Sequence, residues 1–205
     1  IYSDDIIRVL HQQESASLYD FAGLNDEESI YDSAFRKFNF RYKWLLINLL
    51  TSFLAAFTVG MFEDVIAKEV LLAVYMPIVA GMGGNAGTQT LAVMVRGLAF
   101  ADLGWSDILK TLASEVSSGF ANGALNGMIV FSIVYFVQHN FLVATVLGFA
   151  MIVNLVIAAT FGTLVPVVLS KLGKDPASSA TVFITTATDV FGFLAFLGLA
   201  ALLIL

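Results

Sequence analysis

Five apolar stretches, each long enough to cross a membrane, constrain the fold more than any other feature of the sequence. They cover residues 44–62, 70–95, 116–138, 141–170 and 176–205, and Asp189 is the only charged residue inside them. A helix needs about 20 apolar residues to cross the hydrocarbon core of a bilayer. The sequence therefore predicts an all-α membrane protein with five transmembrane helices, whose surroundings are a lipid bilayer.

The composition excludes several other classes of protein. Of the 205 residues, 59% are hydrophobic and only 13% are charged, whereas soluble domains carry about 25% charged residues. The chain has no cysteine and two histidines, which excludes disulfide scaffolds and thiolate sites and leaves too few histidines for a multi-histidine zinc site. A net charge of −6 argues against nucleic acid as a partner. No nucleophile–base pair is recognisable, and we expect the protein not to be an enzyme.

The positions of lysine and arginine predict the topology. Basic residues are enriched in the cytoplasmic segments of membrane proteins. If the N-terminus is cytoplasmic, every basic residue except Lys68 falls on the cytoplasmic side of the five predicted spans. We therefore expect a cytoplasmic N-terminus and an external C-terminus.

The first 40 residues are polar and are expected to lie outside the membrane. The run Asn25-Asp26-Glu27-Glu28 predicts the start of a solvated juxtamembrane helix, with Asn25 as its N-cap. The sequence begins at Ile1 rather than at a methionine, and we expect it to be a piece of a longer or processed chain.

The span 70–95 is unusual because a proline and glycines interrupt its apolar character. Pro77 and four glycines, at positions 81, 83, 84 and 87, fall within 11 residues. Proline removes a helical hydrogen bond and glycine weakens the helix, so we expect a bent or locally opened helix beside a water-lined path. Close helix packing is the alternative. The polar residues of the same stretch favour the path: Asn85, Thr88, Gln89 and Thr90.

Asp189 lies near the middle of the span 176–205. A carboxylate at that depth costs roughly 2.5–3.5 kcal/mol, and no lysine or arginine occurs at matching depth. Thr181 and Thr185 precede Asp189 at intervals of four residues and share one helix face with it. These oxygen ligands suit a hard cation such as Mg²⁺, Ca²⁺ or Mn²⁺. The alternative is an aspartate that is hydrogen-bonded within the packed helices.

Other polar residues of the spans have structural interpretations. Gly119, Gly123 and Gly127, spaced by four, predict a close helix contact. Asn154 is expected to hydrogen-bond a neighbouring helix, and Glu115 to lie at the cytoplasmic membrane interface. Asp175 followed by Pro176 predicts an N-cap and the first helical residue.

These features leave three functions open. The first is a divalent-cation channel, chiefly for Mg²⁺. The second is a cation-coupled secondary transporter that uses Asp189 for an ion or proton. The third is a membrane assembly subunit without transport activity, in which the glycines serve only in packing.

The pattern Pro-x-x-x-Gly-x-x-Gly-Asn-x-Gly-x-Gln at residues 77–89 resembles the signature of the MgtE family of magnesium channels. Residues 95–99, the segment 172–177 and Thr188-Asp189-Val190 are also similar to that family. The resemblance implies a homodimer in the cell (inner) membrane, with a path for Mg²⁺ between the two chains lined by the second and fifth helices. It also implies that Asp189 holds the hydrated ion and that Asn85, Gly81 and Gly84 contribute to the pore, with Thr185 and Thr181 on the same face.

The same resemblance implies a division of the chain into three parts. Residues 1–13 correspond to a remnant of a cytoplasmic regulatory (CBS) domain, residues 14–40 to the cytoplasmic connecting helix, and residues 41–205 to the ion-conducting domain. Regulatory domains outside this sequence are implied as partners that close the pore when Mg²⁺ is plentiful. Asp175 and Glu14 would take part in regulatory Mg²⁺ binding.

Overall fold

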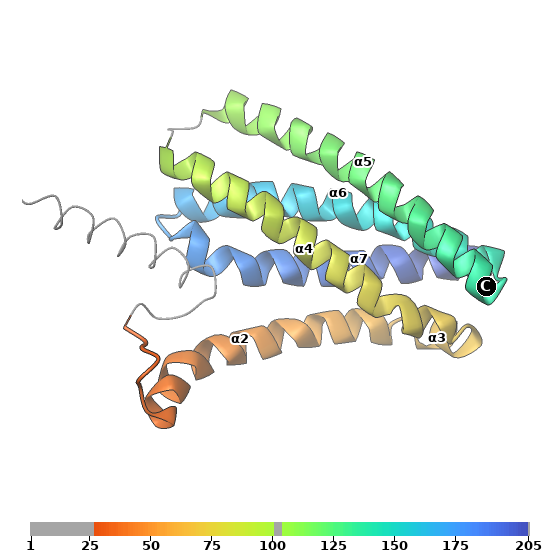
Figure 1. Cartoon of the computed structure of the whole chain (residues 1–205), viewed down its shortest axis with the longest axis horizontal. Coiled ribbons are helices and arrows are strands. Elements are labelled where there is room, and N and C mark those ends of the chain that lie inside the picture. The colour runs from red at the N-terminus through yellow and green to blue at the C-terminus, as the bar shows by residue number, and fades with distance from the viewer. Residues whose placement is uncertain (1–26, 101–103, 205) are drawn as a thin grey trace, which may run out of the picture.

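A computed structural model describes residues 27–100 and 104–204, and all regular structure in these ranges is α-helical. The helices, in chain order, are α2 (Ala34–Gly60), α3 (Glu63–Lys68), α4 (Leu71–Phe100), α5 (Trp105–Gln138), α6 (Phe141–Lys171) and α7 (Pro176–Ile204). The helices α4 to α7 run alongside one another as a bundle, whereas α2 diverges from the bundle and approaches it near α3 (Figure 1). The prediction of an all-α protein is confirmed.

The centre of the bundle is α6, which packs against α4, α5 and α7. Glycines allow the backbones to come close at these contacts. A Cβ atom on Gly123 would lie 2.7 Å from the Ile152 Cα, and one on Gly127 would lie 2.5 Å from the Gly148 carbonyl oxygen. The predicted glycine contact of α5 is therefore confirmed, and its partner is α6.

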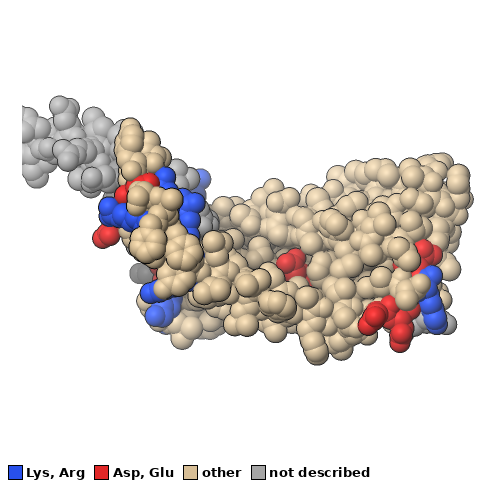
Figure 2. Space-filling view, turned by 90° about the horizontal axis from the view of Figure 1, so that it is seen from below, with Lys and Arg blue, Asp and Glu red and all other residues tan. Residues whose placement is uncertain are grey.

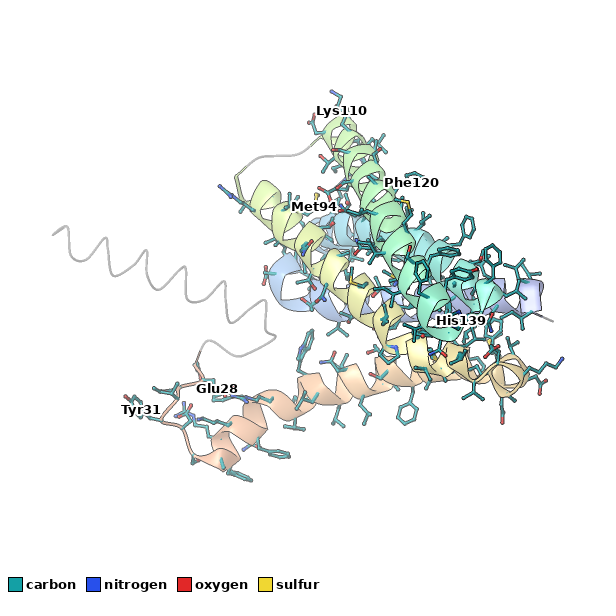
Figure 3. All side chains as sticks on the ribbon, turned by 45° about the vertical axis from the view of Figure 1, so that its right-hand side comes forward. Glu28, Tyr31, Met94, Lys110, Phe120 and His139 are labelled. Atoms are coloured by element: carbon teal, nitrogen blue, oxygen red, sulfur yellow. The ribbon has the colours of Figure 1, made fainter. Side chains whose placement is uncertain are left out.

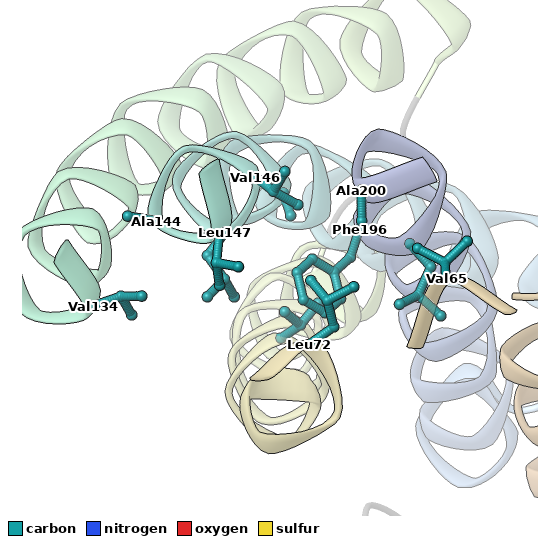
Figure 4. Packing of buried hydrophobic residues seen from close by; sticks show 12 residues of the cluster. Val65, Leu72, Val134, Ala144, Val146, Leu147, Phe196 and Ala200 are labelled. Atoms are coloured by element: carbon teal, nitrogen blue, oxygen red, sulfur yellow. The ribbon is translucent and has the colours of Figure 1, made fainter. Parts of the chain in front are cut away.

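Apolar clusters occupy the two ends of the bundle. The larger cluster lies where α3, α4, α5, α6 and α7 meet, and Leu72, Leu147 and Phe196 are among its fully buried side chains (Figure 4). Two smaller clusters lie toward the other end, around Leu91 and Met94 of α4. The glycines and polar side chains of α4 and α7 lie in the layer between them.

Local side-chain contacts fix the helix ends. Asn140 caps α6 by accepting a hydrogen bond from the Val143 N–H at 3.1 Å, and its amide donates to Glu69 at 3.0 Å. The chain leaves α6 through Gly173, whose φ of +68° favours glycine. The Ala177 N–H then donates to Asp175 Oδ1 at 3.2 Å, which confirms the predicted N-cap. Lys110 and His139 mark the opposite ends of α5 (Figure 3).

The membrane spans agree with the sequence in part. Four described helical segments are long and apolar enough to cross a bilayer: α2, α5, α6 and residues 180–204 of α7. Helix α4 has 30 residues but is not among them, because its glycines, amides and hydroxyls lower its hydropathy. The five-span topology therefore stays a prediction. Charged side chains gather at the two ends of the molecule, and acidic atoms also lie midway along the face seen in Figure 2.

Two local expectations are wrong. The helix predicted to begin at Asn25 is not continuous, because residues 27–33 form turns and the first described helix begins at Ala34 with Ser33 as its N-cap. Within the predicted connecting helix 14–40, only residues 34–40 are therefore helical in the described part, and they continue into α2. The second is the local opening of α4, which runs unbroken through its glycines and through Pro77. The alternative form of that expectation, a bend, agrees with the N-terminal end of α4, which turns toward α3 (Figure 1).

The segment before α2 is held by an ion pair between Glu28 and Arg41. The Glu28 carboxylate is 4% exposed and accepts a hydrogen bond from Arg41 Nε at 3.0 Å. This hydrogen bond with the guanidinium holds the pKa of Glu28 below its ordinary value of 4.5. The pair joins residues 13 positions apart and fixes the turns against the start of α2.

We expect Gly123→Ala to destabilise the bundle by about 1–3 kcal/mol, because the added methyl group would push α5 away from the α6 backbone. Gly198→Ala is the matched control, since no atom lies within 4 Å of the position of its Cβ. Thermal unfolding of the two variants in the same detergent measures the difference. Equal unfolding temperatures would contradict the proposed tight contact.

We expect the Glu28–Arg41 pair to stabilise the protein at neutral pH but not in acid. Because the pKa of Glu28 in the folded protein is lowered from 4.5, its stabilisation is complete above pH 4.5 and is lost as the pH falls through the lowered pKa. Wild type should unfold at a higher temperature than Glu28→Gln at neutral pH, and the difference should vanish in acid. A difference independent of pH would assign the effect to packing instead.

Candidate functional site

The two helices singled out by the sequence, α4 and α7, are in contact. A Cβ atom on Gly87 would lie 2.5 Å from Ile184 Cγ2, and one on Gly84 would lie 3.9 Å from Thr185 Cγ2. The glycines of α4 therefore let α7 approach, as the packing interpretation requires. They also bring two of the predicted pore residues, Gly84 and Thr185, together.

Asp189 lies on α7 one turn beyond Thr185 and is partly exposed. Within the described part of the chain, it has no ion pair and no side-chain hydrogen bond, and the described ion pairs lie at the start of α2. The interpretation of Asp189 as a hydrogen-bonded packing residue therefore has no support among the described residues. A partly exposed carboxylate without a protein partner can serve as a ligand for a cation.

The threonines of α7 use their hydroxyl protons within their own helix. Thr185 Oγ1 donates to the Thr181 carbonyl oxygen at 3.0 Å, and Thr188 Oγ1 donates to the Thr185 carbonyl oxygen at 3.0 Å. These hydroxyls keep oxygen lone pairs as acceptors. Thr181 Oγ1 is buried and has no hydrogen-bond partner in the described residues. Near Asp189, Thr185 therefore offers an oxygen lone pair, whereas the hydroxyl of Thr181 is enclosed by the protein.

The remaining predicted pore residues lie on the uncovered side of α4. Gly81 has open space where a Cβ atom would be, and Asn85 is exposed. Asn85 borders a polar cavity between α4, α5 and α6, and no described contact joins it to Asp189. In a single chain, the predicted pore residues thus lie on two neighbouring surfaces: Asp189 and Thr185 on α7 where it meets α4, and Asn85 on the side of α4 that borders the cavity.

The predicted regulatory site is described only in part. Asp175 is exposed and caps α7, whereas Glu14 lies outside the described residues. Among residues 27–100 and 104–204, no three His, Asp or Glu side chains come together as a metal site. A site at Asp175 would therefore need ligands from elsewhere.

Asn154 has a larger role than its sequence position indicates. It is fully buried on α6, and its Nδ2 donates to the Val79 carbonyl oxygen of α4 at 2.6 Å, which confirms the expected hydrogen bond between helices. Cβ atoms on Gly83 of α4 and on Gly192 of α7 would each lie 2.6 Å from its amide. Asn154 thus fills the space between the two candidate pore helices. The available signal in the sequence was a set of glycines on two helices, α4 and α7, together with one asparagine on a third helix, which is typical of a polar side chain enclosed by closely packed helices.

Glu115 has a partner that the sequence did not indicate. Its carboxylate lines the polar cavity and accepts a hydrogen bond from Thr90 Oγ1 at 3.0 Å, while its predicted place at the membrane interface stays a prediction. Thr90 is only 8% exposed. Helical periodicity locates Glu115 along α5 but does not identify a partner on α4, so sequence reasoning missed this contact.

The structure has long apolar helices that surround a layer of glycines and polar side chains. This arrangement is typical of one class of protein, the multi-pass helical membrane proteins with a polar site inside the bundle. A family model for MgtE, described as a divalent cation transporter, matches residues 76–199. The chain belongs to the MgtE family. This family consists of transporters and not of enzymes, as the sequence predicted.

Three curated relatives, each described as "Magnesium transporter MgtE", support this assignment. The protein of Enterococcus faecalis is 33% identical over 199 residues, that of Bacillus subtilis 30% over 197, and that of Thermus thermophilus 29% over 203. The matches cover 97%, 96% and 98% of this chain but 44%, 44% and 45% of the relatives. The chain thus spans less than half the length of these relatives.

We expect Asn154→Ala to destabilise the contact between α4 and α7, with a loss of about 1–3 kcal/mol in unfolding free energy. The matched control is Thr160→Val on the same helix, because the Thr160 hydroxyl donates to Val156 within α6. Unfolding in detergent gives the stability of each variant. If both variants lost the same unfolding free energy, the proposed role of Asn154 in holding α4 and α7 together would be wrong.

Proposed function

We propose that this chain forms the membrane part of a magnesium transporter of the cell membrane. Mg²⁺ enters the cytoplasm along a path lined by α4 and α7, and Asp189 holds the hydrated ion. The observation that carries this proposal is the partly exposed carboxylate of Asp189, which has no partner among the described residues. It lies one helical turn beyond Thr185, where α7 meets Gly84 of α4. The names of the three relatives support Mg²⁺ as the ion.

The chemistry of the proposed path favours a hydrated ion. Its candidate ligands are carboxylate, amide, hydroxyl and backbone oxygens, which suit hard cations. Mg²⁺ dehydrates reluctantly and keeps several of its waters in protein sites. Thr185 and Asn85 can accept hydrogen bonds from such waters, and Gly81 and Gly84 leave room for them. Thr181 lies one turn before Thr185, but its hydroxyl oxygen is buried and does not face the proposed path in this structure.

A homodimer is part of this proposal, because one chain supplies only one carboxylate. Two copies joined along the uncovered faces of α4 and α7 would place two Asp189 carboxylates around one divalent ion. Helix α2 supports the need for a partner: only Ala55 and Thr58 are buried along its 27 residues. Lipid or a second copy must cover its apolar side chains.

The proposed topology has five spans, with α4 as the second. The described basic residues at one end of the molecule, near the start of α2 (Figure 2), support a cytoplasmic N-terminus. In this arrangement the C-terminus is external. Residues 1–13 and 14–40 remain assigned to a regulatory domain remnant and a connecting segment. Regulatory Mg²⁺ would bind at the cytoplasmic face through Asp175 and Glu14, with further ligands from domains beyond this sequence.

We expect Asp189→Ala to abolish Mg²⁺ entry into liposomes that contain the purified chain, because the variant lacks the negative charge that holds the hydrated ion in the path. An internal Mg²⁺ dye reports entry under an inside-negative potential without any other cation gradient. Glu63→Gln, which removes an exposed carboxylate at the start of α3, should leave entry unchanged.

The outcomes of this experiment separate the candidate functions. Equal Mg²⁺ entry with the wild type and with Asp189→Ala would show that the ion site is not at Asp189. Entry that requires a proton or sodium gradient would identify a coupled transporter instead of a channel.

A further inference from the structure

A polar cavity of about 340 Å³ lies between α4, α5 and α6. No residue of α7 lines it, so it is separate from the contact between α4 and α7. Its polar lining comes from α4 and α5: Asn85, Gln89, Thr90, Glu115, Ser118, Asn122 and Asn126. Leu155 and Ala159 of α6 close its inner side.

A bilayer centred on α5 would place the cavity at the depth of its hydrocarbon core. At a rise of about 1.5 Å per residue, Glu115 is roughly 15 Å along α5 from Trp105, and the whole helix is roughly 50 Å long. A hydrocarbon core of about 30 Å centred on this helix would begin before Glu115. Carboxylate and amide groups at this depth need water or a ligand, because lipid tails offer no hydrogen bonds.

Several side-chain donors around the cavity are already hydrogen-bonded, whereas several side-chain acceptor oxygens are not. Asn122 Nδ2 donates to the Ser118 carbonyl oxygen at 3.0 Å, and Asn126 Nδ2 donates to the Asn122 carbonyl oxygen at 2.8 Å. Their amide oxygens keep free lone pairs. Thr90 donates its proton to one oxygen of Glu115, and no described lysine or arginine pairs with this carboxylate. Oxygen acceptors with a negative charge attract a cation.

We propose that this cavity is a second site for a hydrated divalent cation. Glu115 supplies the charge, and the amide oxygen of Asn122, two turns further along α5, accepts hydrogen bonds from the water shell of the ion. Six waters at about 30 Å³ each occupy about 180 Å³, which the cavity can contain. Asn85 borders both this site and the proposed path, so the site is a reservoir of cations beside the path and does not depend on Asp189.

A cysteine reporter tests the site, because the chain has no cysteine of its own. Ser118→Cys places a thiol in the cavity, and Ser117→Cys places one on the neighbouring exposed position of α5, outside it. In lipid nanodiscs, a charged water-soluble thiol reagent should label Cys at 118 rapidly and Cys at 117 slowly. Saturating Mg²⁺ should slow labelling at 118 by about tenfold, because an occupied site excludes the reagent by mass action.

Two further variants separate this site from the proposed path. Glu115→Gln keeps an acceptor for Thr90 but removes the charge, so it should abolish protection by Mg²⁺. Asp189→Asn should retain the protection, whatever its effect on Mg²⁺ entry.

Three results would overturn the proposal. Slow labelling at 118 would mean that lipid or a second copy covers the cavity. Protection that survives Glu115→Gln would exclude the charge as its cause. Protection lost in Asp189→Asn would assign the effect to the Asp189 path.

Discussion

The close approach of neighbouring helix backbones to α6 is the constraint on which the other features depend. In lipid, apolar surface gives little drive for helices to associate, so dense packing must supply it. The glycines of α5 meet the backbone of α6 directly, as the 2.5 Å between a Cβ on Gly127 and the Gly148 carbonyl oxygen indicates. A larger side chain there would move α5 outward and remove one wall of the polar cavity. Packing and polar chemistry are therefore coupled in this bundle.

The polar groups inside the bundle follow a simple division. Hydroxyl and amide donors bond to helix carbonyls, as Thr185 and Asn126 do within their own helices and Asn154 does between helices. This arrangement satisfies the donors in an environment with few alternatives. It leaves an excess of acceptor oxygens, and the two carboxylates, Asp189 and Glu115, add negative charge to that excess. Under the proposed function, this excess of acceptors suits a cation rather than an anion.

The sequence was a good guide to properties that depend on one helix at a time. Apolar length predicted the long helices, Asp175 with Pro176 predicted the start of α7, and the absence of charge near Asp189 predicted a carboxylate without a basic partner. Contacts between distant residues were not accessible in this way. The pairs Thr90–Glu115 and Glu28–Arg41 depend on the rotation of one segment against another, which helical periodicity alone does not fix.

Helix α4 also shows why composition was ambiguous there. Proline and glycine weaken an isolated helix, and we expected α4 to bend or to open. In the bundle, α4 stays helical because contacts with α6 and α7 compensate for the low propensity, and Gly83 and Gly87 are positions where those neighbours come close. Tertiary packing overrides propensity in this way when close contact is the gain. The glycines of α4 therefore support the interpretation of close helix packing, and they remain compatible with a water-lined path beside the same helix.

The geometry of α4 explains how one helix can border two polar regions. Successive residues of an α-helix point about 100° apart, so Gly84 meets α7 while Asn85 borders the cavity beside α5. A change at one of these positions alters one region and leaves the other wall in place. A chain with few polar residues can in this way keep a carboxylate on each side of a single helix. The adjacent Gly84 and Asn85 thus serve two different surfaces of α4: the glycine allows close contact with α7, and the amide faces the polar cavity.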